Sequence, residues 1–143
     1  MNDETLTYWI NLMRQIAVSA HNGQFRRDGK TPYIKHVLEV ANSVEDRLKP
    51  IALGHDLIED TQITLADLKK AGFPSYVIDA IDLLTHRNNE PNVVYWKKIL
   101  QNKDAVAVKI ADIHANLKDS PTELQSQKYQ RALKLFADAG YSE

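Results

Sequence analysis

The seven residues from His55 to Thr61 read HDLIEDT, which places a histidine and three acidic residues within an otherwise apolar segment. Apolar residues precede this stretch and separate its acids, and their spacing predicts a helix from about Ile51 to Glu59. A carboxylate on a buried helix is costly unless a cation or a metal ion lies beside it. The stretch therefore indicates a buried polar site on a helix.

The spacing within this stretch favours a shared ligand. On a helix, the side chains of the neighbours His55 and Asp56 diverge by about 100 degrees, so they can meet only around a common object such as a metal ion. Glu59 lies four residues after His55 and three after Asp56, which puts all three on the same side of the helix. A histidine next to an aspartate is also common by chance, and the pair alone is compatible with a solvated helix face.

Apolar residues at helical spacing continue on both sides of this stretch, and we predict an all-α fold with no strand. The run AVAVKIADI, residues 105–113, is rich in β-branched residues, so a buried strand is the alternative there. The other predicted helices cover Glu4 to Ala20, Ile34 to about Val44, Leu65 to near Gly72, Pro74 to Leu84, Tyr95 to Leu100, Val106 to Leu117 and Pro121 to Ala139.

Composition narrows the functional classes. A chain of 143 residues fits one domain, so we expect residues 1–143 to form a single helical bundle. The net charge of −1 favours neither nucleic acid nor an anionic membrane, and no apolar run approaches the roughly 20 residues that span a bilayer. We therefore expect a cytoplasmic protein. Cysteine is absent, so any metal would be bound by histidines and carboxylates.

Four stretches in the same order resemble one known family. They are AHNGQFRRDGKTPYIKH at residues 20–36, ALGHDLIEDTQIT at 52–64, AIDLLTH at 80–86 and VKIADIHANL at 108–117. Together they resemble the hydrolase domain of the RelA/SpoT alarmone enzymes, especially the small alarmone hydrolases, within the HD superfamily. The resemblance covers nearly the whole chain and implies a helical HD-type bundle.

The resemblance also implies roles for individual residues. It makes Glu59 and Asp60 the catalytic pair that works with a metal-bound water, and it places the basic loop of Arg26 and Arg27 beside the substrate phosphates. Lys109 matches a further substrate-site residue. The implied metal ligands are His36, His55, Asp56 and Asp112, and Asn116 matches another residue of the substrate site.

The implied ligand set suits a particular kind of metal site. Two imidazoles and two carboxylates leave open positions on a six-coordinate ion, which favours Mn²⁺ or Fe²⁺ over a closed tetrahedral zinc site. The resemblance favours Mn²⁺ as the cofactor. We thus expect a hydrolase that removes the 3′-pyrophosphate of the alarmone (p)ppGpp by attack of a metal-activated water, a reaction of the stringent response.

Two alternatives remain open at this point. The same metal site could serve another phosphorylated nucleotide or dinucleotide, such as NADPH, or the domain could bind nucleotides without turnover. Ile113 stands where the long enzymes have arginine, and Asp119 stands where they commonly have threonine, near the expected guanine pocket. In isolation, His36 would be interpreted as an interfacial histidine, and Tyr95 and Trp96 as core residues. A homodimer is compatible with the small size.

Overall fold

The computed structural model describes residues 1–141, and within this range the regular elements are helical. Two residues of the first connection, Phe25 and Pro32, form an isolated antiparallel bridge. No helix in these residues is both long and apolar enough to cross a membrane. The elements are α1 (Asp3–Ala20), α2 (Ile34–Asn42), the 3₁₀ turn η1 (Asp46–Leu48), α3 (Lys49–Gly54), α4 (Leu57–Asp60), α5 (Leu65–Lys70), α6 (Ser75–Leu84), α7 (Asn92–Ile99), α8 (Lys103–Leu117) and α9 (Glu123–Asp138).

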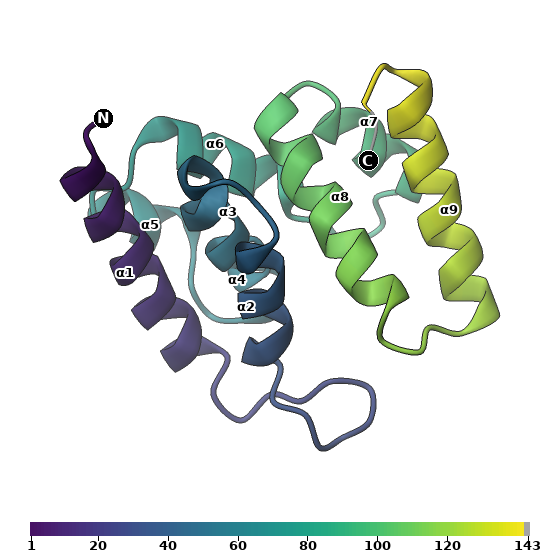
Figure 1. Cartoon of the computed structure of the whole chain (residues 1–143), viewed down its shortest axis with the longest axis horizontal. Coiled ribbons are helices and arrows are strands. Elements are labelled where there is room, and N and C mark those ends of the chain that lie inside the picture. The colour runs from purple at the N-terminus through teal and green to yellow at the C-terminus, as the bar shows by residue number, and fades with distance from the viewer. Residues whose placement is uncertain (142–143) are drawn as a thin grey trace.

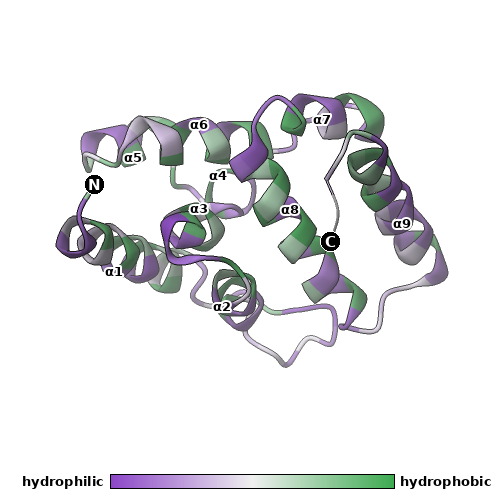
Figure 2. Cartoon of the chain, turned by 45° about the horizontal axis from the view of Figure 1, so that its top comes forward, coloured by the Kyte–Doolittle hydropathy of each residue, from purple (hydrophilic) through white to green (hydrophobic). Residues whose placement is uncertain are grey.

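The short helix α3 lies at the centre of the packing. It contacts α1, α2, α6 and α8, and its residues from Pro50 to Gly54 are all buried. The α1 end of the molecule and the α8–α9 end lie on opposite sides of it (Figure 1). Helix faces that turn toward α3 are mainly hydrophobic, whereas the outer faces of α1 and α9 carry the polar residues (Figure 2). Burial of these apolar faces is the main driving force for the fold.

Local signals explain where several helices begin and end. Thr64 caps α5 by accepting a hydrogen bond from the Asp67 amide, and the Asp67 side chain accepts one from the Thr64 amide in return, as the spacing predicts. Gly72 follows α5 with φ of 92 degrees, a conformation that favours glycine. Other predicted ends coincide with the observed ones, as at Ala20, Leu84 and Leu117. The rest differ by up to three residues, as in α7, which begins at Asn92 instead of Tyr95.

The run AVAVKIADI is helical, so the prediction of a helix there is confirmed and the strand alternative is wrong. Asn102 accepts hydrogen bonds from the amides of Asp104 and Ala105 and thereby starts α8. Val106 and Ile113 are fully buried in α8. Tertiary packing of the β-branched residues thus overrides their weak helix propensity.

The predicted continuous helix from Ile51 to Glu59 is wrong, because it is broken at the histidine–aspartate pair. His55 and Asp56 form a turn between α3 and α4, and the His55 amide bonds back to Ala52 O, three residues earlier. The His55 ring also bonds Ala52 O, and Tyr33 donates its hydroxyl to Asp56 Oδ2 at 2.6 Å. These side-chain bonds compete with the regular helical pattern. Both residues keep backbone angles of the right-handed helical region, yet His55 Nε2 lies 3.0 Å from Asp56 Oδ2. The expectation that the two side chains can meet only around a common object is therefore wrong.

Gly54 is the last residue of α3, directly before this turn. A Cβ atom at this position would lie 2.8 Å from Ile81 Cδ1 and 3.0 Å from Met13 Sδ. We expect Gly54→Ala to lower the free energy of unfolding by about 1–3 kcal/mol, because overpacking outweighs the gain in helix propensity. Urea denaturation followed by circular dichroism measures this change.

Ile81→Val provides the matched test, since it removes the Cδ1 methyl group that the new Cβ would meet. By itself this substitution is expected to cost about 0.5–1.5 kcal/mol. The loss of unfolding free energy in the double variant should be clearly smaller than the sum of the losses in the two single variants. Strictly additive costs would contradict a steric origin for the Gly54 requirement.

Candidate metal centre and adjoining cavity

Four polar side chains from three distant segments meet beside α3. His36 comes from the first turn of α2, His55 and Asp56 from the turn between α3 and α4, and Asp112 from α8. His36 Nε2 lies 2.9 Å from Asp112 Oδ1, and His55 Nε2 lies 3.4 Å from the same oxygen. Asp56 Oδ2 lies 3.0 Å from His55 Nε2 and 4.0 Å from His36 Nε2. The structure thus brings together all four residues predicted as ligands.

The histidine orientations fit a cation at this cluster. His55 donates from Nδ1 to Ala52 O at 2.5 Å, so Nε2 is the ring nitrogen that faces the Asp56 and Asp112 carboxylates. This buried Nε2 has no hydrogen-bond partner among the described residues. One donor atom each from His36, His55 and Asp112 lies within 4.8 Å of the others. Asp56 adjoins this group, so the set offers nitrogen and oxygen donors of the kind that bind divalent ions.

The charges of the cluster also favour a bound cation. Burial alone lowers the pKa of the His55 imidazole, but the Asp56 and Asp112 carboxylates outweigh it and raise that pKa well above its usual value. Burial raises the pKa of Asp112, yet Lys109, whose Nζ lies 3.0 Å from Asp112 Oδ2, and the His36 and His55 contacts lower it well below normal. The carboxylates are thus held in their charged form, ready to bind a positive ion.

The predicted catalytic pair lies beside the cluster, and its two members differ in their surroundings. Glu59 accepts a hydrogen bond from the His86 amide at 2.8 Å, which fixes its carboxylate toward the connection after α6. Asp60 ends α4, and its main-chain oxygen accepts a hydrogen bond from Gln24 Nε2 at 2.8 Å. Partial burial and the neighbouring carboxylates of Asp56 and Glu59 raise the pKa of Asp60 to about 6. Asp60 can therefore exchange a proton near neutral pH.

The raised pKa of Asp60 has a consequence for the metal-free protein. An unfolded aspartate loses its proton near pH 4, whereas folded Asp60 keeps it up to about pH 6, so the folded state loses stability as the pH rises through this window. At pH values above 7, we expect Asp60→Asn to raise the midpoint temperature of thermal unfolding by on the order of 1–3 °C, after allowance for screening by solvent. The gain should vanish near pH 4, and an equal gain at both pH values would contradict this origin.

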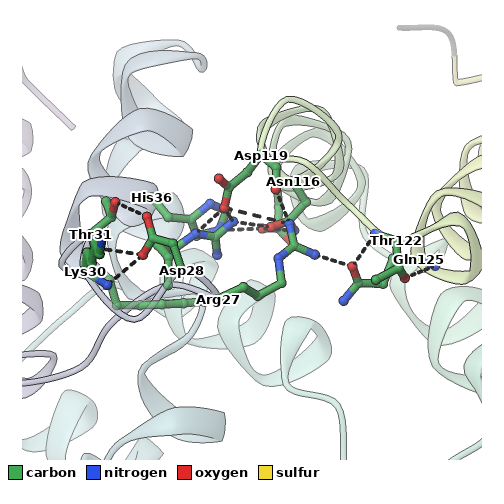
Figure 3. Close-up of polar contacts among 12 residues, drawn as sticks. Arg27, Asp28, Lys30, Thr31, His36, Asn116, Asp119, Thr122 and Gln125 are labelled. Atoms are coloured by element: carbon green, nitrogen blue, oxygen red, sulfur yellow. Dashed lines mark hydrogen bonds and ion pairs between the residues drawn. The ribbon is translucent and has the colours of Figure 1, made fainter.

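A cavity of about 280 Å³ opens next to the cluster. Its lining includes Lys109 and Asn116 from α8 and Arg26 and Arg27 from the loop between α1 and α2, all four predicted as substrate contacts. Asn116 donates to Asp112 Oδ1 at 3.2 Å, so it joins the cluster to the cavity. The side chain of Arg27 extends from its loop toward α9 (Figure 3). Cationic groups therefore border a cavity whose wall contains three of the four candidate metal ligands, His55, Asp56 and Asp112.

Comparison with known proteins adds a sequence relative and a solved structure, while no family model matches the chain. The guanosine-3′,5′-bis(diphosphate) 3′-pyrophosphohydrolase of Haemophilus influenzae is 33% identical over 119 residues, a match that spans 72% of this chain. The chain covers only 17% of the length of this relative. A solved metazoan ortholog of SpoT, described as hydrolysing ppGpp, superimposes with a TM-score of 0.75 at 22% identity, over 92% of this chain and 96% of that one. The sequence match thus covers one segment of a much longer hydrolase, and the structural match shows that this chain has the fold of the SpoT ortholog.

The cavity is also lined by residues that the sequence did not lead us to predict. Gln125, Lys128 and Tyr129 of α9 line it, and their spacing of three and four residues on one helix face is a signal that could have identified them. His86 stacks on Tyr95 with ring centroids 4.3 Å apart and an interplanar angle of 1 degree. Tyr95 is buried, as predicted, and yet borders the cavity.

Of the two departures from the family pattern, Ile113 lies at this cavity, whereas Asp119 is not among its lining residues. Ile113 is fully buried and lines it, so an apolar side chain stands where the long enzymes have arginine. Asp119 is exposed just beyond α8 and pairs with Arg26. In this chain Asp119 thus contacts the basic loop.

Proposed function

We propose that the chain is a divalent-metal-dependent phosphohydrolase that removes the 3′-pyrophosphate from (p)ppGpp. With ppGpp and water, the products are GDP and pyrophosphate. The observation that carries this proposal is the buried cluster of His36, His55 and Asp112, of which His55 and Asp112 line a cavity. That cavity is bordered by Arg26, Arg27 and Lys109. Support for the substrate comes from the Haemophilus influenzae relative, whose name gives this reaction.

His36, His55, Asp56 and Asp112 would hold the metal ion in this proposal. Their mixed nitrogen and oxygen donors suit Mn²⁺, which we propose as the cofactor. When bound, such an ion lowers the pKa of water and polarises a phosphoryl oxygen. Asn116 and Lys109 act on the same centre, because each donates a hydrogen bond to the Asp112 carboxylate and thereby orients it.

The other residues of the cavity would accept the proton of the water and offset the negative charge of the phosphates. Asp60, with a pKa raised to about 6, accepts the proton of the attacking water, and Glu59 orients that water from its fixed position beside the His86 amide. The water oxygen bonds to phosphorus while the bond from phosphorus to the 3′ oxygen breaks, and the proton taken up by Asp60 passes to the 3′ oxygen, which becomes the 3′ hydroxyl of GDP. Arg26 and Arg27 offset the negative charge of the pyrophosphate group, since guanidinium groups bind phosphate in a bidentate manner.

A second substrate class has a specific observation in its favour. Ile113 presents an apolar side chain to the cavity where the resemblance would place an arginine. Another phosphorylated nucleotide or dinucleotide, such as NADPH, could therefore occupy the same site with different contacts to its base. In either case the partner is a small molecule, because the net charge of −1 does not favour a nucleic-acid polymer.

A substrate screen tests the proposal directly. Purified protein loaded with Mn²⁺ is incubated with ppGpp, pppGpp or NADPH, and ion-exchange chromatography separates the nucleotides and pyrophosphate. We expect equal amounts of GDP and pyrophosphate from ppGpp, and no products when a chelator is added before the metal. Release of orthophosphate from NADPH without turnover of ppGpp would replace the first substrate class by the second. The absence of turnover for every substrate would leave a nucleotide-binding domain.

A further inference from the structure

Asp119 lies in the connection between α8 and α9, and its side chain is 46% exposed. Two arginines from the loop between α1 and α2 reach this residue (Figure 3). Arg26 places Nε 2.8 Å and Nη2 2.6 Å from Asp119 Oδ2. Arg27 donates from Nη2 to the Asp119 main-chain oxygen at 2.6 Å, and the same nitrogen lies 3.7 Å from Oδ2. An acidic residue that looks like a solvated surface group thus joins segments more than ninety positions apart.

A second contact links Arg26 to the candidate metal centre. Arg26 donates from Nη2 to Asn116 Oδ1 at 3.0 Å, and Asn116 donates from Nδ2 to Asp112 Oδ1 at 3.2 Å. Only 11% of the Arg26 side chain is exposed, so this arginine is far more constrained than an ordinary surface arginine. Asp119, Arg26, Asn116 and Asp112 therefore form a continuous chain of polar contacts from the basic loop to the cluster.

The loop that carries the arginines is shaped by its own hydrogen bonds. Asp28 accepts from the amides of Lys30 and Thr31 at 2.8 Å each and from the Thr31 hydroxyl at 2.6 Å (Figure 3). These bonds lower the pKa of the exposed Asp28 carboxyl to about 2. They fix the main chain of the turn, but they do not involve the guanidinium groups of Arg26 and Arg27. The guanidinium groups are instead oriented by their contacts with Asn116 of α8, Gln125 of α9 and Asp119 of the connection between these helices.

We propose that Asp119 is a positioning residue, which holds Arg26 and Arg27 at the cavity before a pyrophosphate group binds. This inference rests on the proposed function, because it assumes that the two arginines contact substrate phosphates. An arginine side chain has about 2 kcal/mol of rotamer entropy to lose, and a partner that fixes it in advance lowers the cost of binding. Among the described residues, the hydrogen-bond partners of Arg26 occupy Nε and Nη2, which leaves Nη1 for a phosphate oxygen.

The kinetics of Asp119 variants test this role. Asp119→Ala is expected to raise the KM for ppGpp about tenfold while kcat stays within about twofold, since the lost contact acts on binding. The KM of Asp119→Asn should lie between those of the wild type and Asp119→Ala, because the asparagine amide oxygen can still accept the Arg26 hydrogen bonds but carries no charge. Asp138→Asn is the matched control: it removes the same charge from a surface pair with Lys134, and KM should not change. An unchanged or lowered KM in Asp119→Ala would overturn the proposal.

Two further measurements separate failure of this inference from failure of the proposed function. Isothermal titration with inorganic pyrophosphate should give an about tenfold weaker Kd for Asp119→Ala than for the wild type. Nuclear magnetic resonance of the arginine Nε–H groups should show Arg26 protected from exchange in the wild type and unprotected in the variant. Equal pyrophosphate affinity, or a signal still protected in Asp119→Ala, overturns the positioning role. If wild-type protein fails to hydrolyse ppGpp while both differences are found, the proposed function fails and the positioning role stands.

Discussion

Replacing Asp112 with asparagine is expected to reduce metal-dependent hydrolysis of ppGpp at least about a thousandfold, which corresponds to roughly 4 kcal/mol in the activation barrier. The carboxylate lies within 3.4 Å of both histidines of the cluster and accepts hydrogen bonds from Lys109 and Asn116. Asparagine keeps the shape but loses the charge that binds the cation. Metal content by mass spectrometry after gel filtration, together with pyrophosphate release, measures the effect.

Asp104→Asn is the matched control for this prediction. Asp104 lies on the same helix, α8, and pairs with Arg47, and it is not part of the cavity lining. We expect this variant to retain its metal and its turnover, with a small loss of stability. If Asp112→Asn retained both metal and turnover, Asp112 would not be a ligand, and the cluster of His36, His55 and Asp112 would have to be interpreted as a structural ion-pair network.

Loading the protein with Mn²⁺ is expected to raise its thermal unfolding midpoint by on the order of 10 °C. A ligand present at a thousandfold excess over its Kd stabilises the folded state by about 4 kcal/mol, and each kcal/mol corresponds to about 2–4 °C for a chain of this size. The cluster exists only in the folded state, because its members are separated by up to 76 positions. Differential scanning fluorimetry with and without a chelator measures the shift.

His36→Gln should abolish this shift, because the amide cannot replace the imidazole as a metal ligand. His86→Gln serves as the matched histidine control: His86 borders the same cavity but contacts Tyr95 and Glu90 instead of the cluster. The unfolding midpoint of the metal-free His86→Gln variant can differ from that of the wild type, but Mn²⁺ should still raise it. A shift that survived in His36→Gln would indicate that Mn²⁺ binds elsewhere on the chain.

Much of the fold could be predicted from local features of the sequence. Apolar spacing identified the helical segments, and the Thr64–Asp67 pair marked the start of α5 correctly. The break at His55 and Asp56 could not be predicted in this way, because it depends on Tyr33, which lies 23 positions before Asp56 and donates to its carboxylate. A helical period is a local property, whereas this turn is stabilised by a tertiary contact.

The candidate site shows the same limit more strongly. No spacing rule could join His36 to Asp112, and the ordered family stretches made that connection. The structure places these residues together, and their role as metal ligands stays a prediction. The spacing of Gln125 and Tyr129 places them on one helix face, and the packing of α9 on α8 brings that face to the cavity. Arg26 and Asp119 similarly look like solvated charges in the sequence, and their pairing depends on the packing of α2 beside α8.

The dispersal of the cluster over α2, the turn after α3, and α8 also bears on how the protein is made. During synthesis, the ribosome releases the segment with His36, His55 and Asp56 well before the segment with Asp112. Because Asp112 Oδ1 is the atom that both histidines contact, the nascent chain lacks the complete set of donors until α8 has emerged and docked. Acquisition of a metal ion would then be one of the last steps of maturation, and a ribosome-stalled chain that ends before α8 should be unable to retain one.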